Sequence, residues 1–160
     1  MTDHDPTESL GVALGRVPSG VSIATASFEG RSAGMMASWI QQAAFEPPMI
    51  TLAVKQGRPI EPLIDGAGRF VLNLVGQDAG SLFKTFSKGV PPGENAFDAT
   101  PHTLCPSGPV LSEAIGHLEC KVFAKHRAGD HDLYLAEVTD GQADGQAQPF
   151  VHVRKSGFSY

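Results

Sequence analysis

Residues 30–48 read GRSAGMMASWIQQAAFEPP and form the stretch on which the rest of this chain depends. The stretch follows a Glu29-Gly30 turn, ends at the double proline Pro47-Pro48 and contains almost no charge. Its small residues bury little side-chain area in an ordinary strand, and they would let a flat ligand approach the backbone itself. A buried strand followed by a loop explains the same residues, so the sequence leaves both interpretations open. The small residues are Gly34, Ala37, Ala43 and Ala44.

Length and composition bound the class of protein. At 160 residues the chain fits one domain, which we expect to span residues 1–160. Hydrophobic residues make up 41% and charged residues 18%, as in globular proteins, and no apolar run approaches the roughly 20 residues of a membrane span. The polar, acidic start lacks the profile of a secretory signal, so we expect a cytoplasmic protein without a membrane partner. A net charge of -5 and the lack of a basic stripe argue against a nucleic-acid partner.

Several common catalytic signatures are missing from the sequence. It contains no phosphate-loop motif, no HExxH and no nucleophile elbow, and the glycines of 66–68 precede a strand rather than follow one. The two cysteines, Cys105 and Cys120, match neither a zinc pattern nor a dithiol pair, so we expect reduced thiols without a chemical role. No metal is expected, because the cluster of His126, Asp130, His131 and Asp132 follows no known ligand spacing.

Helical signals occur at three places. Asp5-Pro6 can cap and begin a helix whose apolar stripe should cover another part of the molecule; the stripe consists of Leu10, Ala13, Leu14 and Val17. A short helix is expected over residues 60–64, stopped by Gly66 and Gly68. Asp78 is expected to cap a further helix that ends before Gly89.

The remaining segments predict a mostly antiparallel β fold with short helical additions. The Gly89 to Pro109 segment is rich in Pro, Gly and Asn and reads as a long surface loop, of the kind that forms a lid or a subunit contact. A tight turn is expected at Gly129-Asp130 and a polar turn over residues 141–148. Strands are predicted at residues 21–28, 49–54, 69–75, 117–125, 132–140 and 150–153, with the first turning into the 30–48 stretch.

Polar residues near two of these turns are candidates for a binding site. His131 could donate a hydrogen bond at the edge of a pocket, although a solvated turn histidine is the alternative. Ser38, Lys55 and Arg58 lie on either side of the Pro47-Pro48 turn and could converge on a phosphate. Taken alone, the two cations are better explained as solvated loop charges.

Several segments together resemble the flavin reductase-like family, the FMN-binding split barrels. The resemblance is closest to the C-terminal reductase module of diflavin flavoproteins, and because Met1 opens the domain we expect that module to stand alone here. The segments are Gly30 to Trp39, Phe45-Glu-Pro-Pro48, Arg69-Phe-Val-Leu-Asn73, Gly129-Asp-His131 with Glu137-Val138, and Arg154-Lys-Ser-Gly-Phe-Ser-Tyr160.

The resemblance implies an FMN-binding split β-barrel with short flanking helices, present as a homodimer that holds FMN noncovalently near the subunit boundary. It implies that the family's flavin-contacting strand falls on Met36, Ala37, Ser38 and Trp39, continued by Gln41 and Gln42. By the same resemblance, Lys55 and Arg58 are the phosphate-side residues, and His131 lies near the flavin and the nicotinamide as the candidate catalytic residue. Trp39 is bulkier than the small residue common in relatives, so it is expected to narrow the nicotinamide side or to stack beside the flavin.

The function implied is an NADH- or NADPH-dependent flavin reductase that transfers hydride to FMN, for delivery to an electron-accepting protein or a monooxygenase partner. The cofactor would do the chemistry, while backbone N–H groups stabilise the charge that develops on the ring. A flavoredoxin-like electron carrier, reduced by a protein partner rather than by a nicotinamide nucleotide, is the alternative. A split barrel that holds another planar cofactor such as haem is a third possibility.

Overall fold

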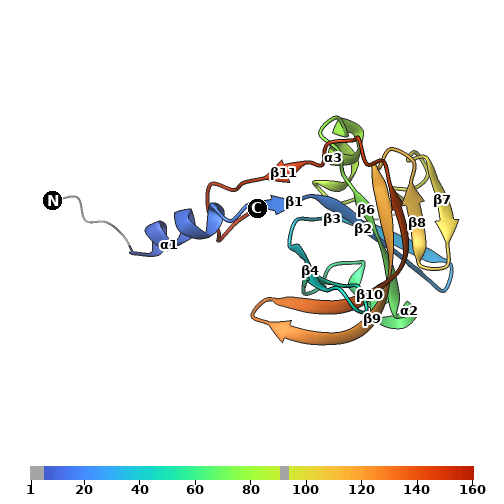
Figure 1. The fold of residues 1–160 in the computed structure, drawn as a ribbon, viewed down its shortest axis with the longest axis horizontal. Coiled ribbons are helices and arrows are strands. Elements are labelled where there is room, and N and C mark those ends of the chain that lie inside the picture. The colour runs from blue at the N-terminus through green and yellow to red at the C-terminus, as the bar shows by residue number, and fades with distance from the viewer. Residues whose placement is uncertain (1–5, 91–93) are drawn as a thin grey trace.

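Seven strands form the main antiparallel sheet, in the order β3-β2-β6-β9-β10-β5-β4 (Figure 1). The structure is a computed structural model, and it describes residues 6–90 and 94–160. The sheet confirms the mostly β class that the sequence predicts. Its strands are β2 (Ser22–Phe28), β3 (Arg31–Ala37), β4 (Ile40–Ala44), β5 (Met49–Lys55), β6 (Arg69–Leu74), β9 (Gly116–Ala128) and β10 (His131–Ala143).

The 30–48 stretch closes the sheet on itself. Strands β3 and β4 lie at opposite edges of the sheet, yet only Ser38 and Trp39 connect them. Three Cα steps, from Ala37 to Ile40, span about 11 Å at most. The sheet must therefore curl until its edges nearly meet, which gives the predicted split barrel. A backbone hydrogen bond of 3.0 Å from Ala53 N to Trp39 O fixes the connection against β5.

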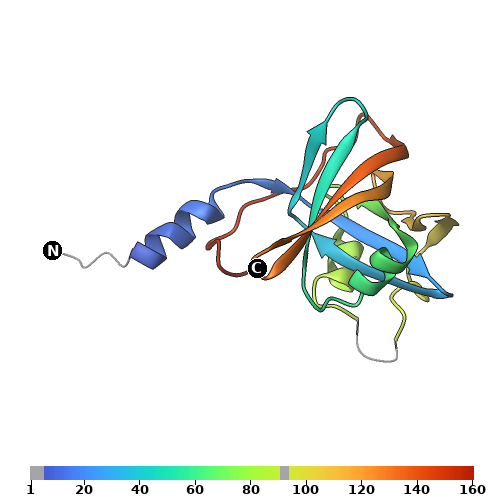
Figure 2. The same cartoon turned by 90° about the horizontal axis from the view of Figure 1, so that it is seen from below.

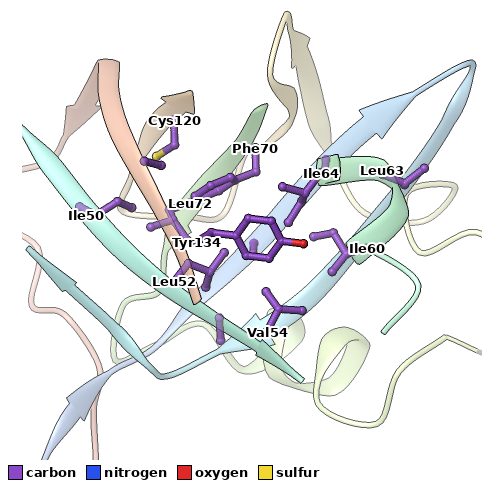
Figure 3. Close-up of a cluster of buried hydrophobic side chains, with 14 residues drawn as sticks. Ile50, Leu52, Val54, Ile60, Leu63, Ile64, Phe70, Leu72, Cys120 and Tyr134 are labelled. Carbon is purple, nitrogen blue, oxygen red and sulfur yellow. The ribbon is translucent and has the colours of Figure 1, made fainter. Parts of the chain in front are cut away.

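A first hydrophobic core fills the inside of the curled sheet (Figure 3). Tyr134 lies at its centre, with its ring among Leu52, Val54 and Ile60, and is only 1% exposed. Helix α2 (Glu61–Ala67) packs on this core through Ile64, which is fully buried. The helix ends where Gly68 adopts a left-handed conformation with φ 65°, which a residue without a Cβ adopts at little cost. The predicted second helix and its stop at Gly68 are confirmed, whereas Gly66, the other predicted stop, lies within the helix.

A second core lies between β2, β3 and helix α3 (Gly80–Phe86). Here Gly34 touches the ring of Phe86, and a Cβ on Gly34 would lie 2.6 Å from Cε1 of that ring. The small residue at position 34 thus makes room for the protein's own aromatic side chain rather than for a ligand. The predicted cap of this helix is wrong, because the N-cap residue is Ala79 and not Asp78.

The predicted loop from Gly89 to Pro109 contains structure that the sequence did not indicate. Strands β7 (His102–Cys105) and β8 (Gly108–Leu111) pair as a hairpin within and just beyond this segment. Residues 91–93 of the predicted loop lie outside the described residues. A buried amide, that of Asn73 on β6, holds β8 through the backbone N–H of Leu111 at 2.7 Å. The segment is therefore fastened to the sheet rather than lying loosely over it.

Helix α1 (Pro6–Gly15) stands away from the main sheet in both ribbon views (Figures 1 and 2). The expectation that its apolar stripe covers the rest of the chain is wrong, because Leu10 is 54% exposed and Val17, just beyond the helix, is 64% exposed. The helix instead packs its buried Gly11 and Gly15 against residues 154–158. The predicted Asp5 cap lies outside the described residues. Two short strands, β1 (Ser19–Gly20) and β11 (Val151–His152), pair where this arm joins the sheet.

Two strands run further than the sequence predicts. Strands β9 and β10 have 13 residues each and form a long hairpin that turns at residues 129–130, as expected. Because β10 continues to Ala143, the first three residues of the predicted polar turn over 141–148 belong to the strand. Among the described helices, none combines the length and the apolar character needed to span a lipid bilayer.

Candidate functional site

Three rings meet where the β3–β4 connection approaches the start of β10. The ring centroids of Trp39 and His131 are 4.7 Å apart, and those of Trp39 and Tyr160 are 5.7 Å apart. Trp39 comes from the connection that closes the sheet, His131 from the first position of β10, and Tyr160 from the tail after β11. We call Trp39, His131 and Tyr160 the aromatic cluster.

Both ring nitrogens of His131 have hydrogen-bond partners. Nδ1 lies 2.7 Å from a carboxylate oxygen of Asp130, and Nε2 lies 2.7 Å from the hydroxyl of Tyr160. The hydrogen bond from His131 is the main cause of a lowered pKa of Asp130, so this carboxylate is ionised and can only accept. In the neutral imidazole Nδ1 therefore carries the proton, and Nε2 accepts the hydrogen bond that the Tyr160 hydroxyl donates.

Three cationic residues lie beside the aromatic cluster. The guanidinium carbon of Arg154 lies 4.9 Å from the centroid of the Trp39 ring, within cation–π distance. Lys55 is the cross-strand partner of His131 in the β5–β10 pair. Arg58 belongs to the same loop as Lys55, because its backbone N–H donates to the carbonyl of Lys55 at 3.3 Å. Burial raises the pKa of Tyr160, while the positive charge of Arg58 acts to lower it. We call Lys55, Arg58 and Arg154 the cationic rim.

The loop that carries Lys55 and Arg58 is tied to the start of β10. The backbone N–H of Gln56 donates to the carbonyl of Asp130 at 3.1 Å, and the Gln56 side chain donates to a carboxylate oxygen of Asp132 at 3.0 Å. These two bonds bracket His131 in the sequence. The backbone of the loop that carries the two cations therefore keeps a fixed position relative to His131.

A network of charged groups includes Asp132, the residue that follows His131 on β10. The ammonium group of Lys125 lies 2.8 Å from Asp65, 3.1 Å from Glu61 and 3.2 Å from Asp132. Partial burial alone would lower the pKa of Lys125, but its hydrogen bonds to Asp65, Tyr134, Glu61 and Asp132 outweigh this and raise it. Hydrogen bonds, first from Gln56, lower the pKa of Asp132 to about 2. This network links α2 to β9 and β10 and leaves each of its charges paired.

The structure gathers some of the predicted site residues and separates others. Trp39, His131 and Lys55 come together, and Arg58 lies on the loop that follows Lys55. Half-buried Ser38 adjoins Trp39 in the chain. Met36 packs against the second core and Ala37, 4% exposed, belongs to the first, so only their backbones lie at the edge of the sheet. Gln41 and Gln42 are exposed on the edge strand β4, outside the aromatic cluster.

Three residues of the site have no role in the sequence-based prediction. Tyr160 and Arg154 belong to the closing segment that carries part of the family resemblance, but the resemblance assigned neither a function. Asp130 precedes His131 in the Gly-Asp-His motif. The available signal was their position within matched motifs; nothing in the local pattern indicates that the tail reaches back to β10.

Two hollows elsewhere on the surface do not include these residues. One, of about 450 Å³, lies beside β8 and the start of β9 near Leu111 and His117, and another, of about 550 Å³, lies before α3 near Gln77 and Ala79. The described residues contain no group of three or more histidine, cysteine or acidic side chains placed to hold a metal ion. Neither hollow contains a member of the aromatic cluster or the cationic rim.

The side chains of the cluster suit a ligand that is both flat and anionic. Rings such as Trp39 offer stacking area to a planar heterocycle. The rim offers the donors that phosphate oxygens prefer, and an arginine can bind them with two parallel hydrogen bonds. A flavin or nicotinamide nucleotide has both features, so the residues present fit such a group.

Comparison with known proteins identifies a family and similar proteins for this chain. Residues 14–159 match the model of the family described as "Flavin reductase like domain". The chain is 37% identical over 151 residues to diflavin flavoprotein A 1 of Synechocystis sp., and 36% identical over 163 residues to a putative diflavin flavoprotein A 6 of Nostoc sp.. These matches cover 92% and 99% of this chain but only 26% and 28% of the relatives. The chain thus spans about a quarter of the length of these proteins.

Solved structures share the fold. An NADH:FAD oxidoreductase of Streptomyces globisporus C-1027 superposes with a TM-score of 0.82 at 22% identity, over 89% of this chain and 85% of that one. The styrene monooxygenase flavin reductase of Pseudomonas putida S12 gives a TM-score of 0.76 at 24% identity, over 89% and 90% of the two chains. At these identities the likeness establishes the fold alone.

Proposed function

Because the chain belongs to the flavin reductase-like family, we propose that it binds FMN and reduces it with NADH or NADPH. The observation that carries the proposal is the aromatic cluster of Trp39, His131 and Tyr160 beside three cationic residues. A ring-shaped, phosphorylated ligand needs both kinds of side chain in one place. FMN, when bound, supplies the hydride-accepting ring, and the protein supplies orientation and electrostatics.

The edge of β3 is the proposed contact for the flavin ring. Strand β3 ends the sheet, so within the described residues its outer side has no neighbouring strand, and backbone N–H and C=O groups there can pair with a ligand. The side chains of Met36 and Ala37 are directed into the cores, which leaves their backbones to serve this purpose. In this proposal Trp39 stacks beside the ring, and Ser38, Gln41 and Gln42 line the polar side.

The phosphate is proposed to bind at the loop after β5. Lys55 and Arg58 are both exposed there and are free to turn toward a ligand, while Gln56 keeps the loop attached to β10. Their charges are matched to a phosphate dianion. His131 is proposed to position the nicotinamide through Nε2, with Asp130 holding the ring in the tautomer that leaves Nε2 as an acceptor.

Anaerobic stopped-flow absorbance tests the proposal. The protein with FMN is mixed with NADH and, separately, with NADPH, and the loss of the yellow flavin band is followed. Rapid bleaching with either nucleotide is expected, with the rate saturating as the nucleotide concentration rises. Bleaching no faster than in free FMN would refute the proposed reductase activity. Flavin content after gel filtration shows in addition whether FMN stays bound.

An electron carrier without efficient nucleotide turnover is the second candidate. It is favoured by one observation, namely that His131 is only 6% exposed and has partners on both ring nitrogens. A site used only for electron transfer needs no open face for a nicotinamide. The two candidates differ in the stopped-flow experiment, because a carrier would bind FMN tightly yet bleach only when a reduced protein partner is added.

We also propose a homodimer that passes reducing equivalents to a cytoplasmic acceptor, such as a monooxygenase. Large apolar side chains are exposed on α1, just beyond it and on the tail that packs against it. Among them are Leu10 (54%), Val17 (64%) and Phe158 (59%). Burying such side chains against a second copy would remove them from water. Sedimentation velocity tests the dimer, and a monomer at micromolar concentrations would refute it. Pull-down with candidate acceptors tests the partner.

A further inference from the structure

His131 is covered in the structure. Its side chain is among the few buried polar groups, with 6% of its surface exposed, although it lies at the end of a strand beside a tight turn. Trp39 packs on its ring, and the Tyr160 hydroxyl occupies Nε2 at 2.7 Å. Any ligand that uses Nε2 must therefore replace the hydrogen bond from Tyr160.

Tyr160 itself is mostly exposed at this position. The residue is 71% exposed, and its ring centroid lies 5.7 Å from that of Trp39. The backbone hydrogen bonds of the tail go to α1, from Arg154 N to Gly15 O at 3.1 Å and from Gly157 N to Gly11 O at 2.6 Å. The tail is thus anchored on the arm rather than on the sheet, and Tyr160 can leave His131 without breaking a strand pairing.

The position of His131 does not depend on Tyr160. Its backbone pairs with Lys55 on one side and Ala128 on the other, and Asp130 holds Nδ1. Removing the Tyr160 hydroxyl would free Nε2 while the imidazole stays in place. Tyr160 therefore acts as a cover more than as a support.

We propose that Tyr160 is a displaceable cover of His131, which competes with the nicotinamide nucleotide for Nε2 and so sets the affinity of the site for that substrate. The exchange replaces one hydrogen-bond donor to Nε2 by another, because the N–H of the primary carboxamide of nicotinamide donates to Nε2 as the tyrosine O–H does. The inference rests on the proposed function for its substrate, whereas the covering of His131 can be tested without any cofactor.

The first measurement is the rate at which diethyl pyrocarbonate modifies His131 in the protein without FMN, read by peptide mass spectrometry. The reagent attacks an unprotonated imidazole nitrogen, which in His131 is Nε2. Exposed His126 in the same β9–β10 hairpin is the internal reference. Loss of one neutral hydrogen bond changes an equilibrium by roughly two- to tenfold, so Tyr160→Phe should raise the His131 rate by that factor. Tyr160→Ala should raise it further, with the His126 rate unchanged.

The second measurement is steady-state reduction of FMN by NADH and NADPH. Tyr160→Phe should lower the KM for the nucleotide by roughly two- to tenfold and leave kcat nearly unchanged, since only the competitor is removed. Phe123→Leu is the control, because Phe123 is 73% exposed on β9 and outside the cluster.

Two results would overturn the proposal. An unchanged His131 modification rate in both variants would show that Tyr160 is not the cover, and a raised KM in Tyr160→Phe would make it a nucleotide ligand instead. If the wild-type protein and every variant fail to reduce FMN, the proposed function is wrong, and the modification rates alone then decide whether Tyr160 covers His131.

Discussion

The side-chain carbonyl of Asn73 accepts a 2.7 Å hydrogen bond from the backbone N–H of Leu111, and this bond ties the β7–β8 excursion to the main sheet. The Asn73 amide group also donates to the carbonyl of Ile23 and to the hydroxyl of Thr25, each at 3.1 Å. All of this lies in the interior, where Asn73 and Thr25 have no exposed surface. A buried amide with its hydrogen bonds satisfied can fix one element against another, but it makes the fold sensitive to the loss of any partner.

Replacement of Asn73 by alanine is expected to destabilise the protein by about 2–6 kcal/mol, because at least two buried backbone groups lose their partner at about 1–3 kcal/mol each. Urea unfolding followed by circular dichroism measures the change. Ser27→Ala is the control, since Ser27 shares only a half-buried hydroxyl pair with Ser32. We expect the control to lose about 1 kcal/mol or less. Equal losses in both variants would mean that the Asn73 network contributes no more stability than the half-buried hydroxyl pair of Ser27 and Ser32.

The contact between Gly34 and Phe86 gives a second prediction. A Cβ at position 34 would approach the ring of Phe86 to 2.6 Å, so Gly34→Ala is expected to cost about 1–3 kcal/mol through overpacking. Phe86→Leu creates room at the same place. The double variant should therefore lose less stability than the sum of the two single variants, which a double-mutant cycle by urea unfolding measures. Strict additivity would show that the two residues do not share one packing site.

This contact also explains why the 30–48 stretch could be only half understood from the sequence. A glycine that admits a ligand and a glycine that admits the side chain of Phe86, 52 positions away, look alike in the local pattern. Hydrophobic alternation and turn residues predicted the strands of the main sheet, because one face of each strand meets a core. They could not predict that β3 and β4 are opposite edges, since strand order depends on contacts between distant segments.

The candidate site, too, could be predicted from the sequence only in part. The family resemblance brought Trp39, Lys55, Arg58 and His131 together in advance. The structure places Trp39 against His131, pairs His131 with Lys55 across two strands and carries Arg58 on the loop that follows Lys55. Tyr160 was missed because its contact with His131 spans 29 positions and involves no regular element. The exposed face of α1 was misread for a related reason. An apolar stripe indicates that something covers the helix, but not whether the cover belongs to the same chain.

The stability of the protein at low pH should depend on the ionisation of Asp132. Its pKa is lowered to about 2 by hydrogen bonds, first from Gln56, whereas an aspartate in an unfolded chain titrates near ~3.9. The folded state thus favours the ionised form, so this stabilisation is fully present above the unfolded pKa and is lost as pH falls from about 4 towards about 2. Urea midpoints measured across this range should fall less steeply in Asp132→Asn than in the wild type. The control is Asp98→Asn, at an exposed position, and identical slopes in wild type and Asp132→Asn would contradict the assignment.

The proposed phosphate site gives the last prediction. If Arg58 binds the FMN phosphate, Arg58→Ala removes a charge-assisted hydrogen bond and should weaken FMN binding by about tenfold or more, with a smaller loss at high salt. Calorimetric titration with FMN and with riboflavin measures this, because riboflavin lacks the phosphate and its affinity should change little.

The matched control is Arg69→Ala. Arg69 pairs with Lys121 on β9, and Lys121 pairs with Glu137, which lies six residues from His131 along β10. At about 3.3 Å per residue this is roughly 20 Å from the cationic rim, beyond the Debye length of about 8 Å in physiological salt. Equal losses in the Arg58 and Arg69 variants would indicate a general effect of net charge, and an equal loss for riboflavin and FMN would move Arg58 from the phosphate to the ring.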